Sequence, residues 1–403
     1  KRKLLLIVFI ILSIGLLMVY SSSHIWAQYK ENDSFYYFKR QAIFVIVGLL
    51  LLFFFSKIDY HLYQKHSLKI IILATILLVL VLIPGVGIVR GGSRSWFNLG
   101  LFALQPSEIY KIALIIYVSD YISHHYHQMK KLRYCLKPLI VMGIGFFLIM
   151  LQPDFGSGFV MCCSILLMII ITPFPFRYII FLGLSGILMI ILMIISAPYR
   201  MKRIFAFLDP FQDPLGSGFQ MIQSLYAIGP GGILGSGFDQ SIQKHFYLPE
   251  PQTDFIFAIY LEEFGFIGGI LLILLYAYLF ITCFNYAKKV DDLFGSFLMI
   301  GMTSMIGIQT IINLGVVVGL FPVTGVTLPL VSSGGSSILS TLFVFAIIMI
   351  SIYAPADTIN LPILTKKERK TKKILSYITM IISLSIALVI NNTLISSILI
   401  YTI

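Results

Sequence analysis

Long apolar runs recur along this 403-residue chain, and they constrain its fold more than any other feature. We place them at about 4–20, 41–56, 68–84, 107–123, 138–151, 157–172, 178–197, 255–283, 294–318 and 336–353. Several approach or exceed the ~20 residues that an α-helix needs to cross a bilayer. The runs are continuous, whereas the strands of a membrane β-barrel alternate apolar and polar residues. The sequence therefore predicts an all-α polytopic membrane protein with about ten transmembrane helices.

Composition supports this fold class and narrows the possible partners. Hydrophobic residues make up 58% of the chain and charged residues only 11%, which excludes an ordinary soluble domain. The net charge of +12 does not indicate nucleic-acid binding, because basic loops on the cytoplasmic side and contact with anionic membrane lipids explain it better. With a cytoplasmic N-terminus, the inner loops carry roughly twice as many Lys and Arg residues as the outer loops, which predicts the orientation.

Three connections on the predicted outer side are much longer than a turn, at 85–106, 198–253 and 319–337. Long loops that do more than connect two helices are usually functional. The longest joins the seventh and eighth helices and contains an amphipathic segment at 219–228, which we expect to lie on the membrane surface.

The chain divides into a membrane domain and a tail. We predict a transmembrane domain over 1–355, with the long extracytoplasmic loop at 198–254, followed by a basic cytoplasmic linker at 356–373. An extra hydrophobic segment at 374–403 is either an eleventh crossing or a helix on the inner surface.

Asp254 lies where the long loop meets the eighth helix. The two prolines of LPEPQ prevent the helix from starting earlier, so Thr253 or Asp254 is the natural N-cap. A capping carboxylate would be structural, whereas a functional role is favoured because the three long connections lie on the same predicted outer face. Glu262 and Glu263 follow about 12 Å deeper, and at least one of them must face a polar cavity or a basic residue. A proton-coupled transporter would show the same acids.

Three further charged residues have two interpretations each. Asp154, in LQPDFGSG, either caps the start of the next helix or serves function near the outer face. Glu108 and Lys111 are three residues apart on the fourth helix, so they form a structural pair with each other or hold partners on neighbouring helices. We favour the structural pair.

The outer loops also carry candidate ligands for a phosphate. Trp96 is either a membrane anchor or, with Arg94, brackets a phosphate and its attached lipid or sugar. A basic set binds lipid headgroups nonspecifically or holds a pyrophosphate, and it comprises Arg200, Lys202, Arg203 and Lys244. The turn SSGG, with Ser333, Gly334 and Gly335, is suited to anion contact through backbone N–H groups.

Together these stretches resemble the SEDS family (shape, elongation, division and sporulation), which includes FtsW, RodA and SpoVE. The matching pieces run in the family's order and are GSRSWFNLG with QPSE, LQPDFGSG, DPFQDPLGSGFQMIQSLYAIGPGGILGSG, QKHFYLPEPQTDFIFAIYLEEFGFIGG and GLFPVTGVTLPLVSSGGSS. They cover about 4–355, and the long loop looks most like the FtsW and SpoVE branch. The chain departs from the pattern at LVSSGGSS, where many members have a tyrosine before the glycines, and in its extra C-terminal segment.

The resemblance implies a peptidoglycan glycosyltransferase of the bacterial cytoplasmic membrane, acting in cell division or sporulation. Such proteins polymerise lipid II, the undecaprenyl-pyrophosphate-linked disaccharide pentapeptide, at the outer face, together with a class B penicillin-binding protein. The family's essential aspartate transfers to Asp254 and its important tryptophan to Trp96.

The chemistry agrees with these residues. A sugar hydroxyl needs a general base, for which Asp254 is the candidate, and the leaving pyrophosphate needs cations, supplied by Arg and Lys or by a divalent Mg or Mn ion. A single attack inverts the anomeric carbon, and no organic cofactor is expected. A lipid II flippase is the alternative, because it also needs a polar cavity and intramembrane acids. A purely structural division scaffold is a third option.

Overall fold

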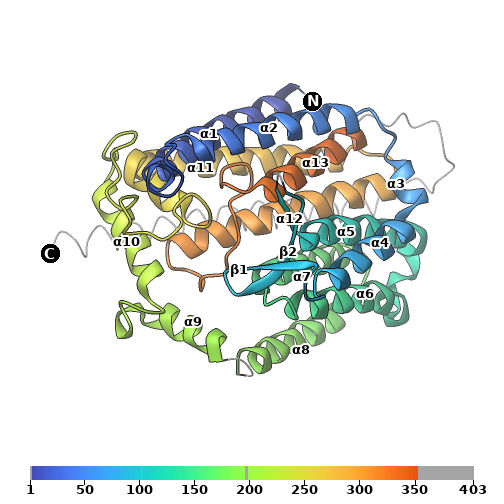
Figure 1. Ribbon diagram of the computed structural model, residues 1–403. Helices are drawn as coiled ribbons and strands as arrows, with labels where there is room; N and C mark the ends of the chain where they lie inside the picture. Colours follow the sequence, from blue (N-terminus) through green and yellow to red (C-terminus); the bar gives the residue numbers. More distant parts are fainter. Residues whose placement is uncertain (1, 101, 196–197, 353–403) are drawn as a thin grey trace.

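The computed structural model describes residues 2–100, 102–195 and 198–352, and they form a helical bundle (Figure 1). Within these described ranges, five helices are long and apolar enough to cross a membrane: α1 (Arg2–Glu31), α2 (Tyr36–Phe55), α6 (Leu132–Met150), α11 (Ile256–Ala287) and α12 (Leu293–Val317). Five more apolar helices are α4 (Ser67–Leu80), α5 (Pro106–His125), α7 (Phe155–Ile170), α8 (Phe176–Ile195) and α13 (Gly335–Ser351). These ten match the runs predicted from sequence, so the polytopic all-α class is confirmed.

Short elements fill the connections. They are α3 (His61–Lys65), the 3-10 turns Tyr126–Lys130 and Pro210–Gln212, α9 (Pro198–Leu208) and α10 (Phe219–Gly231). The long loop that contains α9 and α10 lies at the end of the bundle opposite α3 (Figure 1). Helix α10 confirms the amphipathic segment as a helix; it packs on α11, and Ser224 donates to the Val317 carbonyl at 2.8 Å. The basic linker and the extra segment at 356–403 lie outside the described residues.

The connection at 85–106 is folded rather than an open loop. It forms a small antiparallel sheet of β1 (Gly87–Arg90), β2 (Ser93–Asn98) and β3 (Ala103–Leu104), in that order. Gly91 and Gly92 have positive φ angles at the turn between the first two strands, a conformation that glycine tolerates without steric cost. The sheet places Trp96 opposite Ile88, so this connection has a defined structure, and its functional role stays a prediction.

Helix α12 is the centre of the bundle, and most of its residues are buried. It packs against α5, α7, α11 and α13. Gly301 permits close approach there, because a side chain at this position would overlap Ile115 of α5 and Met168 of α7. A helix enclosed in this way can carry polar side chains at membrane depth, since they face protein rather than lipid.

Helix α11 is broken at Gly265, whose φ is 63° and ψ is −165°. The break leaves backbone N–H groups of α11 without acceptors in the helix, and the long loop supplies them. Phe266 N–H donates to the Gly232 carbonyl at 2.9 Å, and Ile267 N–H donates to the Ile233 carbonyl at 3.1 Å. In return the loop donates N–H groups to the carbonyls of Glu262 and Glu263 at 2.9 and 3.0 Å. Backbone at this depth must be paired within the protein, and residues 232–237 do that for α11.

Candidate active site

Asp254 does not cap the helix that follows it. Helix α11 begins at Ile256 with Phe255 in the capping position, and no side chain caps it. The Asp254 carboxylate is half-buried and receives no hydrogen bond from the described part of the chain. Only its backbone is held, because Asn313 Nδ2 donates to the Asp254 carbonyl at 2.7 Å. The capping interpretation is therefore wrong, and the carboxylate is left available.

The surroundings of Asp254 adjust its acidity. Desolvation, with the neighbouring charges of Glu250 and Asp154, raises the pKa of Asp254 to about 6, while Arg203 opposes this shift. Desolvation is the largest cause. A carboxylate with this pKa is mostly ionised at neutral pH and is a stronger base than an ordinary aspartate.

The segment 324–328 forms a wall beside the carboxylate. A Cβ at Gly325, where φ is 72°, would lie 3.6 Å from Asp254 Oδ2. Asn313 Nδ2 also donates to the Val326 carbonyl at 2.7 Å, so the same side chain holds this wall and the Asp254 backbone.

The SSGG turn is used for internal bonding. Ser333 N–H donates to the Gln252 carbonyl at 2.8 Å, and Gly334 N–H to Gln41 Oε1 at 3.2 Å. Gly335 starts α13 where the Phe44 ring leaves no room for a side chain. These two N–H groups are therefore not free for an anion, contrary to the sequence-based expectation; instead they fasten the loop before Asp254 to α2 and α13.

Asp154 is a helix cap, as one of its two interpretations predicted. It accepts from Ser157 N–H at the start of α7 at 3.1 Å and from Gln105 Nε2 at 2.8 Å. Gln105 directly follows the hairpin, and its N–H donates to Ser336 Oγ of α13 at 3.2 Å. Asp154 thus ties the hairpin, α7 and α13 together near Asp254.

Glu108 and Lys111 form the expected pair on α5, with 2.7 Å between Oε1 and Nζ. The pair is buried, and it also reaches neighbouring helices: Lys111 donates to Gln309 Oε1 at 3.5 Å, and Ser340 Oγ donates to Glu108 Oε2 at 3.1 Å. Gln309 in turn donates to the Thr327 carbonyl at 3.1 Å. The pair is therefore structural and supports the wall beside Asp254.

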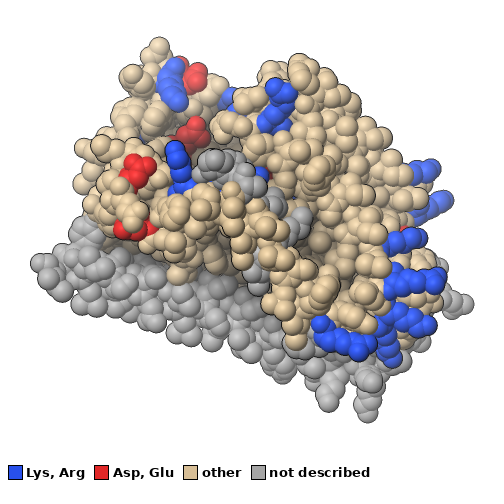
Figure 2. Space-filling view, turned by 90° about the horizontal axis from the view of Figure 1, so that it is seen from below, with Lys and Arg blue, Asp and Glu red and all other residues tan. Residues whose placement is uncertain are grey.

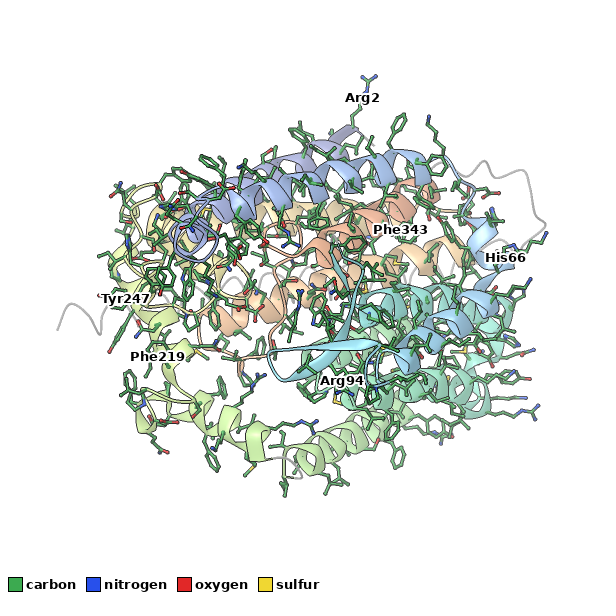
Figure 3. The ribbon with its side chains drawn as sticks, viewed as in Figure 1. Arg2, His66, Arg94, Phe219, Tyr247 and Phe343 are labelled. Carbon is green, nitrogen blue, oxygen red and sulfur yellow. The ribbon has the colours of Figure 1, made fainter. Side chains whose placement is uncertain are left out.

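Trp96 and Arg94 lie two residues apart on β2 and are half-buried. The pairing of β1 with β2 shifts register between them, because Trp96 is opposite Ile88 and Arg94 is opposite the next residue, Val89. Such a shift interrupts the regular alternation of faces, so the two side chains do not share one face by strand geometry. Arg94 donates to the Leu82 carbonyl at 3.4 Å and lies at the hairpin in Figure 3.

The four basic residues of the long loop divide into two places. Lys202 and Arg203 are exposed on α9, where they line a cavity of about 290 Å³ with Gln220 of α10. Arg203 also donates to the Val323 carbonyl at 3.1 Å, beside the wall. Arg200 lies on α9 and is half-buried. Lys244 instead is buried in ion pairs with Asp239 and, at 3.3 Å, with Glu263, so it has no free position at the surface.

A second, apolar cavity of about 460 Å³ lies between α7, α11 and α12. Its lining includes Phe155, Phe159, Phe280, Phe284 and Phe321. Thr324 also lines it, next to Gly325 of the wall, so this cavity adjoins the Asp254 site. Its lining suits a long hydrocarbon chain.

Sequence reasoning missed the amides that organise this site, above all Asn313 and Gln309 of α12. A signal was present. Two amides one helical turn apart in the apolar stretch IGIQTIINLG must face protein, and such residues are commonly functional.

The family model for the FtsW, RodA and SpoVE cell cycle proteins matches residues 2–355 of this chain. A model for accessory gene regulator B matches residues 310–403. Stage V sporulation protein E of Bacillus subtilis (strain 168) is 48% identical over 345 residues, which cover 85% of this chain and 94% of that protein. A probable peptidoglycan glycosyltransferase FtsW of Trichlorobacter lovleyi is 40% identical over 348 residues, covering 86% and 91%.

Solved structures share the fold. A chain from a structure titled "Structural coordination of polymerization and crosslinking by a peptidoglycan synthase complex" aligns with a TM-score of 0.72. The two sequences are 29% identical, and the alignment covers 87% of this chain and 97% of that chain. The rod shape determining protein RodA of Thermus thermophilus aligns with a TM-score of 0.64 at 24% identity, covering 87% and 96%.

Proposed function

Because this chain belongs to the FtsW, RodA and SpoVE family and is a peptidoglycan glycosyltransferase of the FtsW and SpoVE branch, we propose that it polymerises lipid II with Asp254 as the general base. One observation carries the assignment of Asp254: its carboxylate is left without a hydrogen bond among the described residues, while its backbone and the wall beside it are firmly held. Unpaired, desolvated carboxylates of this kind are typical of catalytic sites.

The reaction needs one proton acceptor and one charged leaving group. Asp254 takes the proton of the acceptor sugar's 4-hydroxyl as that oxygen bonds to the anomeric carbon of the donor sugar. The bond from the anomeric carbon to the prenyl pyrophosphate breaks, and the pyrophosphate leaves with the electron pair. A single displacement inverts the anomeric carbon, so no second carboxylate nucleophile is required.

Lys202 and Arg203 are the cations that the geometry offers to the pyrophosphate. Both line the cavity between α9 and α10, and Arg203 is close enough to Asp254 to oppose the rise of its pKa. Arg200 on the same helix, and Arg94 and Trp96 on β2, are further candidates for substrate contact. Lys244 is left out of the site, because its ammonium is already paired with two carboxylates.

A divalent Mg or Mn ion stays a prediction from the sequence. No group of three or more potential metal-binding side chains comes together in the described ranges, and Asp154 already accepts hydrogen bonds from Ser157 and Gln105. The proposed mechanism therefore assigns no step to a metal.

The distribution of charge supports the proposed orientation in the membrane. Figure 2 shows Lys and Arg gathered toward one end of the molecule, the end where α3 lies in Figure 1, while the opposite end carries both signs. The positive-inside tendency supports placing the first end in the cytoplasm and Asp254 at the outer face. The apolar cavity of about 460 Å³ then offers a place for the prenyl tail beside the site. A class B penicillin-binding protein is the proposed partner.

The test uses the purified full chain with its class B penicillin-binding protein in vesicles, supplied with labelled lipid II. We expect glycan chains from the native protein and none from Asp254→Asn. Asp33→Asn is the matched control, because Asp33 also lies in an outer connection but pairs with Lys39 at 2.9 Å. Native glycan yield from Asp254→Asn would contradict the proposal. If lipid II instead crosses the vesicle membrane regardless of this substitution, the flippase alternative is favoured.

A further inference from the structure

Asn313 is a buried amide of α12, with only 1% of its surface exposed. Its Nδ2 donates to two backbone carbonyls, those of Asp254 and Val326, each at 2.7 Å. Both partners can only accept, so the amide has one workable orientation, with its nitrogen toward them. Its Oδ1 has no hydrogen-bond partner among the residues that the structure describes, so turning the amide over would gain nothing.

The two hydrogen bonds join the two sides of the carboxylate site. Asp254 is on one side, in the loop that leads into α11, and Val326 is on the other, next to Gly325, which borders the carboxylate. One side chain thus sets the distance between the carboxylate-bearing backbone and the wall opposite it.

A second amide on the same helix shows what is particular to Asn313. Gln309, one turn earlier, donates to the Thr327 carbonyl at 3.1 Å and accepts from Lys111 at 3.5 Å. Gln309 therefore holds the wall to α5 and α12, whereas Asn313 holds the wall to Asp254. Both stand on the most enclosed helix of the bundle, which is a rigid support for a catalytic group.

We propose that Asn313 is the positioning residue of the reaction: its two hydrogen bonds fix Asp254 at the place from which the carboxylate reaches the acceptor hydroxyl. The inference rests on the proposed function of Asp254. A general base must lie within hydrogen-bond reach of the proton it takes, and a displacement of about 1 Å can lower the rate ~100-fold.

The experiment measures kcat and KM of lipid II polymerisation by the full chain with its partner. Asn313→Ala is expected to lower kcat by ~10- to 100-fold and to leave KM within about threefold, because the base is displaced while the substrate contacts remain. Thr310→Ala is the matched control: Thr310 is equally buried on α12, but among the described residues its hydroxyl donates only to the Ile306 carbonyl of the same helix, at 2.9 Å. It is expected to keep the native kcat.

A pH profile separates positioning from a general loss of stability. The charged groups that act on Asp254 are Glu250, Arg203 and Asp154, and none of them is changed. When Asn313 is lost, Asp254 becomes more hydrated and its pKa moves toward its ordinary value. The acid limb of kcat/KM should therefore shift to lower pH in Asn313→Ala and stay in place in Thr310→Ala.

Three outcomes decide the inference. If Asn313→Ala does not fold, Asn313→Val fills more of the space without a charge and also lacks the donors, and the same fall in kcat is expected. A native kcat in either folded Asn313 variant, or a fall no larger than in Thr310→Ala, would overturn the positioning role. Failure of the proposed function shows differently, as polymerisation that survives Asp254→Asn.

Discussion

Asp254 and the pair Glu262–Glu263 lie on either side of the start of α11, but they differ in whether their carboxylates have hydrogen-bond or ion-pair partners. Glu262 accepts from Ile242 N–H at 2.7 Å and from Ser241 Oγ at 2.5 Å, and Glu263 pairs with Lys244. Asp254 receives no hydrogen bond from the described residues. Buried acids that are bonded hold structure, whereas an acid left unpaired is available for chemistry. We therefore expect substitution of Asp254 to reduce activity, and substitution in the glutamate cluster to reduce stability.

The largest effect is expected from Asp254→Asn. Removal of a general base lowers polymerisation by roughly two to four orders of magnitude. The folded protein should keep or raise its unfolding temperature, because the pKa of Asp254 is raised and its ionised form therefore opposes folding above the ordinary pKa. Glycan yield and thermal unfolding of the same preparation check both parts. If Asp254→Asn lost its activity because it no longer folded, Asp254 would be a structural residue like the two glutamates.

Lys244→Met tests the other side of the comparison. It leaves Glu263 as an uncompensated buried charge, which costs about 3–5 kcal/mol of stability. Thermal unfolding should show a clear destabilisation, while the activity of the protein that remains folded stays near native. The double variant Lys244→Met with Glu263→Gln removes both charges and should recover part of the loss. An unchanged unfolding temperature would show that this cluster is not structural.

Arg203→Ala is expected to lower the polymerisation rate about tenfold, since one of several cations facing the leaving pyrophosphate is lost. Lys39→Ala is the control, because Lys39 is also an exposed outer cation but is paired with Asp33. The rate of Arg203→Ala should also depend less on salt than that of the native chain. Equal rates for the two variants would place the pyrophosphate elsewhere.

The smallest effect is a change with pH. Because Asp254 acts as a base with a pKa of about 6, kcat/KM should fall to half its plateau near pH 6 and about tenfold per unit below it. A base at the ordinary value of 3.8 would leave the profile flat down to pH 5. Rates measured from pH 5 to 8, on the native chain and the Lys244→Met variant, should show the same acid limb in both.

The sequence predicted the helices well because long apolar runs are a direct signal of membrane-spanning length. The ion pair Glu108–Lys111 and a partner for Glu263 also followed, since charges at depth require partners. Lys244 was misjudged: its position in a loop indicated a surface cation, and its acidic partners come from elsewhere in the fold. The SSGG turn likewise had N–H groups whose acceptors, Gln41 and Gln252, are distant in sequence. Such pairings arise only when the helices assemble.

The break in α11 at Gly265 has a consequence for how this chain tolerates changes in length. Residues 232–237 look like an ordinary glycine-rich surface loop, a kind of segment in which insertions and deletions are normally accepted. Here they are joined to the two halves of α11 by backbone hydrogen bonds in a fixed register. Adding or removing one residue would shift every one of these bonds, so this loop is as intolerant of insertion as the interior of a transmembrane helix.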